Sequence, residues 1–173
     1  LKQSQGIQLA IEAFPEILEK VPNARLIIIG TGLYEEKLRN MVHELGLKDI
    51  ISFLGYVDDH HDIERALCEC GIALAPYVPD PSGITAYADP MKPKVYMAYG
   101  LPVIITDVPW VASIIREREA GIVIKYSKKD FIEAALNLMT NHDIYLKCRE
   151  NALKLASQYF PEHIFSRALA YMV

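Results

Sequence analysis

The residues best placed to do chemistry lie in the middle of the sequence, where a short helix is predicted to begin at a proline. Asp89 is a favourable N-cap residue, Pro90 fits the first helical position, and Gly100 fits the position just past the helix end. Such a helix presents unpaired backbone N–H groups and a partial positive charge at its N-terminus, where Lys92 and Lys94 add two full charges. The segment therefore predicts a diphosphate site, although an ordinary helix between two strands would carry the same local signals.

The other side chains capable of metal or redox chemistry form no ligand set. Cys68, Cys70 and Cys148 contain no Cys-x-x-Cys pair, and the histidines, among them the adjacent His60 and His61, form no His-Glu-x-x-His motif. There is no Asp-x-Asp either, so we expect neither a metal nor a resident cofactor. Reduced, mostly buried thiols are expected, which indicates a reducing compartment.

Length and charge restrict the class of protein. A chain of 173 residues suits one domain, or one large half of a two-domain protein, and a net charge of −4 argues against a nucleic-acid partner. No run of 18 apolar residues and no signal peptide are visible, so a cytoplasmic location is expected. Because Leu1 is not an initiator methionine, we expect residues 1–173 to be a single domain cut from a larger protein.

Short apolar runs alternate along the sequence with segments of helical period. Continuous apolar strands separated by helices predict a doubly wound, Rossmann-like α/β fold, with a parallel sheet and helices on both of its faces. Gly121 is read as a stop between a helix and the last strand. The expected strands are 25–30, 50–54, 72–75, 102–106 and 122–125, and the expected helices are 7–18, 35–45, 59–69, 90–99, 110–118, 129–140, 143–158 and 161–172.

Three loops reach the edge of this predicted sheet at which ligands bind, beyond the carboxyl ends of the strands. They are the glycine turn 30–32, the segment 55–57 and the long Pro/Gly-rich loop 76–89. A nicotinamide dinucleotide site is not expected, because the third glycine of Gly-x-Gly-x-x-Gly would fall at Glu35 and no acidic residue ends the next strand.

Four segments, in this order and spacing, resemble the C-terminal, donor-binding domain of GT-B glycosyltransferases, closest to family 4. The resemblance covers nearly the whole chain, and it implies a nucleotide-sugar site in this domain and an acceptor site on an N-terminal domain outside the sequence. The segments are LIIIGTG at 26–32, ISFLGYV at 51–57, CGIALAP at 70–76 and YMAYGLPVI at 96–104.

The resemblance also implies roles for individual residues. Gly30, Thr31 and Gly32 would approach the nucleotide, and the backbone at Tyr56 and Val57 would contact the base. These residues come from the turns that follow the first two strands.

The same comparison implies that the helix starting at Pro90 and Met91 holds the diphosphate, with Lys92 offsetting its charge. The family often places two glutamates here, one near the transferred sugar and one that accepts bonds from the ribose hydroxyls. This chain has Tyr87 and Val95 at those positions, so a catalytic contact to the sugar would fall to Tyr87 or to the nearby Asp89.

The predicted function is therefore the donor domain of a glycosyltransferase that moves a sugar from a nucleoside diphosphate sugar to an acceptor hydroxyl, as in polysaccharide biosynthesis. The resemblance favours retention of anomeric configuration. The isolated piece is expected to be inactive, because catalysis needs both domains closed on the substrates. Two alternatives stay open: a sugar-nucleotide epimerase with the same domain, and a non-catalytic binding or interaction module, which the loss of both glutamates favours.

The resemblance finally implies a strand ahead of the first helix, lying between strands 25–30 and 72–75. The sequence begins too late to supply it, and without it the two halves of the sheet would share no ladder. We expect upstream residues of the same protein, or another segment, to fill this gap. Any membrane contact is expected only through the missing domain.

Overall fold

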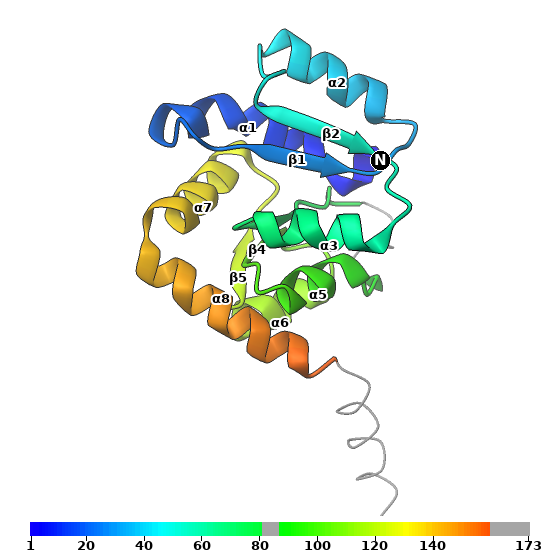
Figure 1. Cartoon of the computed structure of the whole chain (residues 1–173). Helices are drawn as coiled ribbons and strands as arrows, with labels where there is room; N and C mark the ends of the chain where they lie inside the picture. Colours follow the sequence, from blue (N-terminus) through cyan, green and yellow to red (C-terminus); the bar gives the residue numbers. More distant parts are fainter. Residues whose placement is uncertain (81–86, 160–173) are drawn as a thin grey trace, which may run out of the picture.

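The computed structural model describes residues 1–80 and 87–159 (Figure 1). Residues 81–86 of the expected loop 76–89, and the whole of the expected helix 161–172, therefore lie outside the described residues. Within the described ranges, no helix is long and apolar enough to cross a membrane.

The five strands of the described part are parallel and form two separate sheets (Figure 1). In one sheet, β1 (Leu26–Ile29) pairs with β2 (Ile51–Gly55). In the other, β4 (Val103–Thr106) lies between β3 (Ala73–Ala75) and β5 (Gly121–Ile124). The predicted parallel α/β architecture is confirmed. No ladder joins β1 to β3 in the described ranges, and this break falls where the sequence lacks an expected strand.

The helices alternate with the strands in the predicted order, and most of their ends lie within about two residues of the predicted ones. A short 3-10 helix precedes them at Gln3–Gln5. They are α1 (Ile7–Lys20), α2 (Glu35–Glu44), α3 (His60–Glu69), α5 (Met91–Ala98), α6 (Val111–Glu117), α7 (Lys128–Thr140) and α8 (His142–Ser157).

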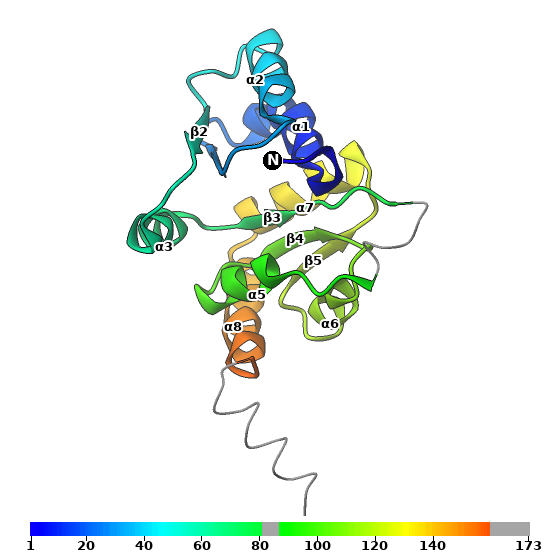
Figure 2. The ribbon, with the colours of Figure 1, turned by 90° about the vertical axis from the view of Figure 1, so that its right-hand side faces the viewer.

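Helices cover both faces of the three-stranded sheet, as Figure 2 shows from the side. The side chains of β4 alternate between the two faces because successive residues of a strand point in opposite directions. Ile104 packs in a core with α1 and α7, whereas Val103 and Ile105 pack in a second core with α5, α6 and the end of α8. All three are fully buried, which explains why this strand reads as a continuous apolar run.

The prediction that Gly121 separates a helix from the last strand was wrong, because Gly121 is the first residue of β5. It pairs with Val103 of β4, and a Cβ at this position would lie 2.7 Å from the Val103 nitrogen. Only glycine allows the two backbones to approach so closely. The helix α6 ends earlier, and the turn is made by Glu119 with a positive φ of 51°.

Candidate functional site

The helix α5 begins at Met91, and its N-cap is Pro90, not Asp89 as the sequence predicted. The cause is the backbone of Pro90, which is extended (φ −70°, ψ 130°), so the helix starts one residue later. The Asp89 carboxylate accepts a hydrogen bond from Nζ of Lys94 at 2.5 Å. Gly100 does follow the helix end as predicted, with φ 69° and with its N–H donating to the Met97 carbonyl at 2.9 Å.

The start of α5 offers fewer backbone donors than an ordinary helix. The first four N–H groups of a helix have no partner within it. Two of these positions are prolines here, Pro90 and Pro93, and proline has no N–H. The backbone N–H groups of Met91 and Lys92 remain, and neither has an acceptor among the residues that the structure describes. Two amides at the positive end of a helix dipole still suit one phosphate group.

The two lysines of this helix have different surroundings. The Lys94 side chain is only 12% exposed, and its Nζ lies between the Asp89 carboxylate and the Tyr159 ring, 4.7 Å from the ring centroid. Lys92 is exposed and pairs with no carboxylate in the described ranges. Partial burial of its ammonium group lowers the pKa of Lys92. Of the two lysines, Lys92 is therefore the one whose ammonium group can bind an anion. The expectation that Lys94 also binds the diphosphate is corrected, because Lys94 already pairs with Asp89.

Three further predicted site residues on or before this helix lie at the surface. Tyr87 is 89% exposed, Met91 is 66% exposed and Val95 is 38% exposed. Val95 has no polar side-chain atom, so it cannot accept a bond from a ribose hydroxyl. Of the two residues predicted near the transferred sugar, Tyr87 carries an exposed phenol, whereas the Asp89 carboxylate is already paired.

The glycine turn 30–32 follows β1 and has the backbone conformations that its glycines predict. Gly30 and Gly32 have φ values of 110° and 155°. The Gly30 N–H donates to the Gly55 carbonyl at 2.7 Å, which fixes the turn against the end of β2. Thr31 and Gly32 are exposed. The turn therefore presents backbone to solvent at the carboxyl end of β1, as a nucleotide contact would require.

The segment after β2 exposes an aromatic ring. Tyr56 is 74% exposed, and its hydroxyl lies 3.4 Å from a carboxylate oxygen of Asp58, while Val57 is half-buried. The next helix, α3, then begins at once, because Asp59 accepts a hydrogen bond from the N–H of His61 at 2.8 Å. The sequence allowed either Asp58 or Asp59 as this N-cap, and the structure shows Asp59 in that place.

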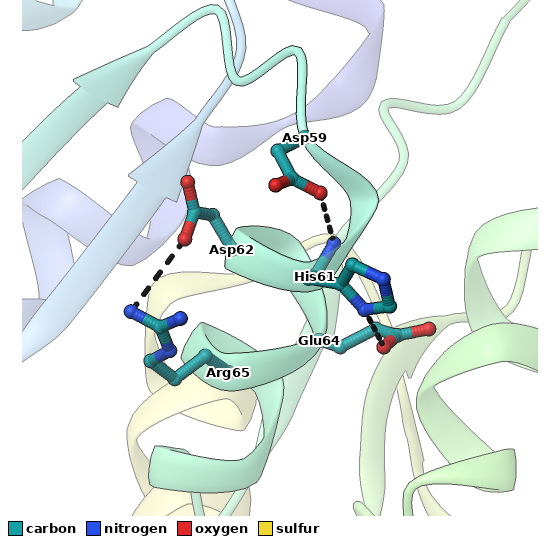
Figure 3. Close-up of polar contacts among 5 residues, drawn as sticks. All are labelled: Asp59, His61, Asp62, Glu64 and Arg65. Atoms are coloured by element: carbon teal, nitrogen blue, oxygen red, sulfur yellow. Dashed lines mark hydrogen bonds and ion pairs between the residues drawn. The ribbon is translucent and has the colours of Figure 1, made fainter.

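Charged side chains in the first turns of α3 pair with one another (Figure 3). The Nδ1 atom of His61 lies 3.2 Å from the Glu64 carboxylate, and Arg65 lies 3.6 Å from Asp62. These exposed pairs add little stability individually. The His61 ring thus pairs with a carboxylate of its own helix. No group of three potential metal-binding side chains meets within the described ranges.

The first six residues, which we call the N-terminal strap (residues 1–6), connect the ends of β1 and β3. The Leu1 nitrogen donates to the Thr31 carbonyl, and the Leu1 carbonyl accepts from the N–H of Tyr34 at 3.2 Å. Farther along, the Ser4 carbonyl accepts from the N–H of Val78 at 3.0 Å. The strap therefore touches both the glycine turn and the segment that follows β3.

The start of α5 lies at this same edge. Because α5 connects the parallel strands β3 and β4, it runs antiparallel to them, so its N-terminus lies at their carboxyl ends. Figure 1 shows the start of the chain beside the arrowheads of β1 and β2. The glycine turn, the strap and the donors of α5 thus lie toward the carboxyl ends of the strands.

A separate hollow of about 290 Å³ lies between α6 and the end of α8 and is lined by Trp110, Ile114, Glu117, Arg118, Gln158 and Tyr159. None of these residues was predicted to bind ligand. The Tyr159 ring that lines it also holds Lys94, a contact between positions 65 residues apart (159 − 94) that no local pattern could reveal. The strap contacts were missed for the same reason.

Comparisons with known proteins give a consistent result. The sequence matches the model of the family described as glycosyl transferases group 1 over residues 1–155. An uncharacterized glycosyltransferase of Methanocaldococcus jannaschii is 30% identical over 132 residues, which are 76% of this chain and 32% of that protein.

Two solved structures share the fold. HepE of Anabaena in complex with UDP has a TM-score of 0.81 at 18% identity, over 99% of this chain and 46% of that chain, and it was also solved with UDP-glucose. The C-terminal domain of a group 1 family protein from Francisella tularensis has a TM-score of 0.76 at 22% identity, over 92% and 81% of the two chains. The chain thus spans about a third of the archaeal relative and less than half of HepE.

Proposed function

Because this chain belongs to the family of glycosyl transferases group 1, we propose that it is the nucleotide-sugar-binding part of an enzyme that transfers a sugar to an acceptor hydroxyl. The observation that carries the proposal is the meeting of three features at one sheet edge. They are the exposed glycine turn, the Met91 and Lys92 amides of α5, and the ammonium group of Lys92; neither these amides nor this ammonium group pairs with a group of residues 1–80 or 87–159.

In the proposed complex the nucleotide lies along the glycine turn 30–32, and the backbone at Tyr56 and Val57 faces the base. The diphosphate then lies at the N-terminus of α5, against the amides of Met91 and Lys92. The Lys92 ammonium group stabilises the negative charge that develops on the leaving diphosphate. Preorganised charge of this kind is often the largest single contribution to catalysis.

The sugar end of the site has weaker support. Val95 offers no acceptor to the ribose, and the loss of such bonds costs about 1–3 kcal/mol of donor binding. Tyr87 and Asp89 are both exposed just before α5, but Asp89 is held in an ion pair by Lys94. We infer that Tyr87 contacts the sugar directly and that Asp89 acts there only if its ion pair opens. We also propose that the transferred sugar retains its anomeric configuration and that the transfer uses no metal ion.

We further propose that an upstream domain of the same protein binds the acceptor and that an upstream strand joins β1 to β3. The two strand edges face a break in the sheet, and the matched relative in M. jannaschii is about three times longer than the matched region. The enzyme would act in the cytoplasm, with any membrane contact made by the upstream domain.

Calorimetric titration of the protein with UDP, GDP, ADP and the matching monophosphates tests the proposal. We expect saturable binding of at least one diphosphate, tighter than its monophosphate because the second phosphate meets α5. Absence of binding by all three diphosphates would contradict the proposed site.

Incubation with a nucleotide sugar whose nucleotide binds, with and without acceptor, then separates the alternatives, since an epimerase would convert the donor when no acceptor is present. The relative in M. jannaschii and the protein from F. tularensis are glycosyltransferases by name, which favours transfer.

A further inference from the structure

The buried amide of Gln8, in the first turn of α1, links the N-terminal strap to the end of β5. Its Nε2 donates to the Gln3 carbonyl at 3.1 Å and to the Tyr126 hydroxyl at 2.9 Å. Tyr126 follows β5 closely in the chain. The strap already touches the ends of β1 and β3, so this one amide connects it to a third strand end.

The orientation of this amide is fixed by its neighbours. The Gln3 carbonyl can only accept, so the atom facing it must be Nε2, and exchanging the amide oxygen and nitrogen would bring two acceptors together. Oε1 is then buried, and no described group donates to it. Gln8 as a whole is only 9% exposed. A buried acceptor without a donor destabilises a fold, so an apolar side chain would serve stability better here.

The strap fits tightly where it enters α1. Gly6 has a φ of 71°, and a Cβ there would overlap the Pro76 carbonyl and approach the Tyr126 ring to 3.1 Å. The strap thus has little freedom between the ends of β3 and β5. Burial raises the pKa of Tyr126, so its hydroxyl stays protonated and serves as a bonding partner, not as a base.

We propose that Gln8 and Tyr126 form a positioning pair that holds the N-terminal strap, and through it the glycine turn, in the geometry that binds the nucleoside diphosphate. This inference rests on the proposed function. The pair touches no ligand. It acts through the Gln3 carbonyl, the strap, and the contacts of Leu1 with the glycine turn. The buried Oε1 atom of Gln8 costs some stability, and lower stability in exchange for function is common at functional sites.

The test compares Gln8→Met, which keeps the side-chain length but loses both bonds and the buried oxygen, with Tyr126→Phe, which loses only the link to β5. Gln158→Met, just past the end of α8, and Tyr145→Phe, on α8, are control substitutions of the same residue types away from the strap. We expect both test variants to weaken binding of the diphosphate that binds the unaltered protein on the order of 10-fold, because misplacement by a fraction of an ångström is costly. In the intact enzyme the donor KM should rise while kcat is kept.

Two further readouts separate positioning from a structural role. The amides of the strap and of Val78 should exchange hydrogen faster in both test variants, and the midpoint of unfolding of Gln8→Met should stay unchanged or rise. A lower midpoint with unchanged affinity would overturn the inference and leave Gln8 a packing residue. Unchanged affinity in Tyr126→Phe would overturn it even if Gln8→Met failed to fold. If the unaltered protein binds no nucleotide, the proposed function fails first, and this inference fails with it.

Discussion

The same substitution at two neighbouring lysines, Lys92→Met and Lys94→Met, should have opposite effects on binding and stability. Methionine keeps most of the apolar stem and removes the charge. Lys94 is nearly buried between Asp89 and Tyr159, whereas Lys92 has no carboxylate partner in the part of the chain that the structure describes. The pair therefore separates a lysine that holds the fold from one that is free to meet a ligand.

The magnitudes follow from these contacts. The Asp89 side chain is 55% exposed, so its ion pair with Lys94 counts as a largely exposed one and contributes about 0.2–1 kcal/mol. The contact of Lys94 with the Tyr159 ring adds about 0.5–1 kcal/mol. Lys94→Met should thus lower stability by about 1–2 kcal/mol, or roughly 2–8 °C in Tm. Lys92→Met should change stability by less than about 0.5 kcal/mol.

The losses of diphosphate affinity should have the reverse order, with the larger loss in Lys92→Met. A hydrogen bond to a charged group contributes about 1.5–3 kcal/mol, so Lys92→Met should weaken diphosphate binding by roughly 10-fold or more. Lys94→Met should bind nearly as well as the unaltered protein. Calorimetric titration and thermal unfolding of both variants make the comparison. Equal losses of affinity in the two variants, or a loss confined to Lys94→Met, would refute the assignment of Lys92 to the ligand and Lys94 to the fold.

Three other outcomes are expected. Gly121→Ala should destabilise the protein by about 1–3 kcal/mol in urea unfolding, because the added methyl group meets the backbone of β4, while Gly71→Ala, whose Cβ would find only a side-chain oxygen at 3.9 Å, should not. Affinity for a nucleoside diphosphate should fall as pH rises through the pKa of Lys92, which burial lowers, so the loss should begin at lower pH than for an ordinary lysine and should disappear in Lys92→Met. Asp59→Ala should cost about 1 kcal/mol through loss of the α3 cap, and Asp58→Ala clearly less, as measured by thermal unfolding.

Much of the fold follows from local signals in the sequence. Apolar runs of strand length, alternating with segments of helical period, predicted the elements and their order. The resemblance to the donor-binding domain of GT-B glycosyltransferases is confirmed by the family match and the shared fold. Local patterns sufficed here because each helix start and each buried strand is determined mainly by its own few residues.

The site was predicted less completely, because it depends on contacts between distant residues. The sequence could place Lys92 and Lys94 on one helix, but only the fold shows that Tyr159 and Asp89 engage one of them. The predicted start of α5 was wrong by one residue. Proline often occupies the first helical position, but the extended backbone of Pro90 makes it the N-cap here. The bond between Gln8 and Tyr126 joins positions that are 118 residues apart.

The break between the two sheets has a mechanical consequence. No ladder crosses it in the described ranges, and the two halves are joined there by α1, which packs on α2 at one side and on α7 at the other, and by the N-terminal strap. For residues 1–173 alone, force across the break would therefore act on the apolar contacts of α1, such as those of Ile11 and Phe14, and on the strap, whereas the proposed upstream strand would add a ladder. The half containing β1 and β2 should then move as one unit relative to α7, because the apolar contacts of α1 have no fixed direction.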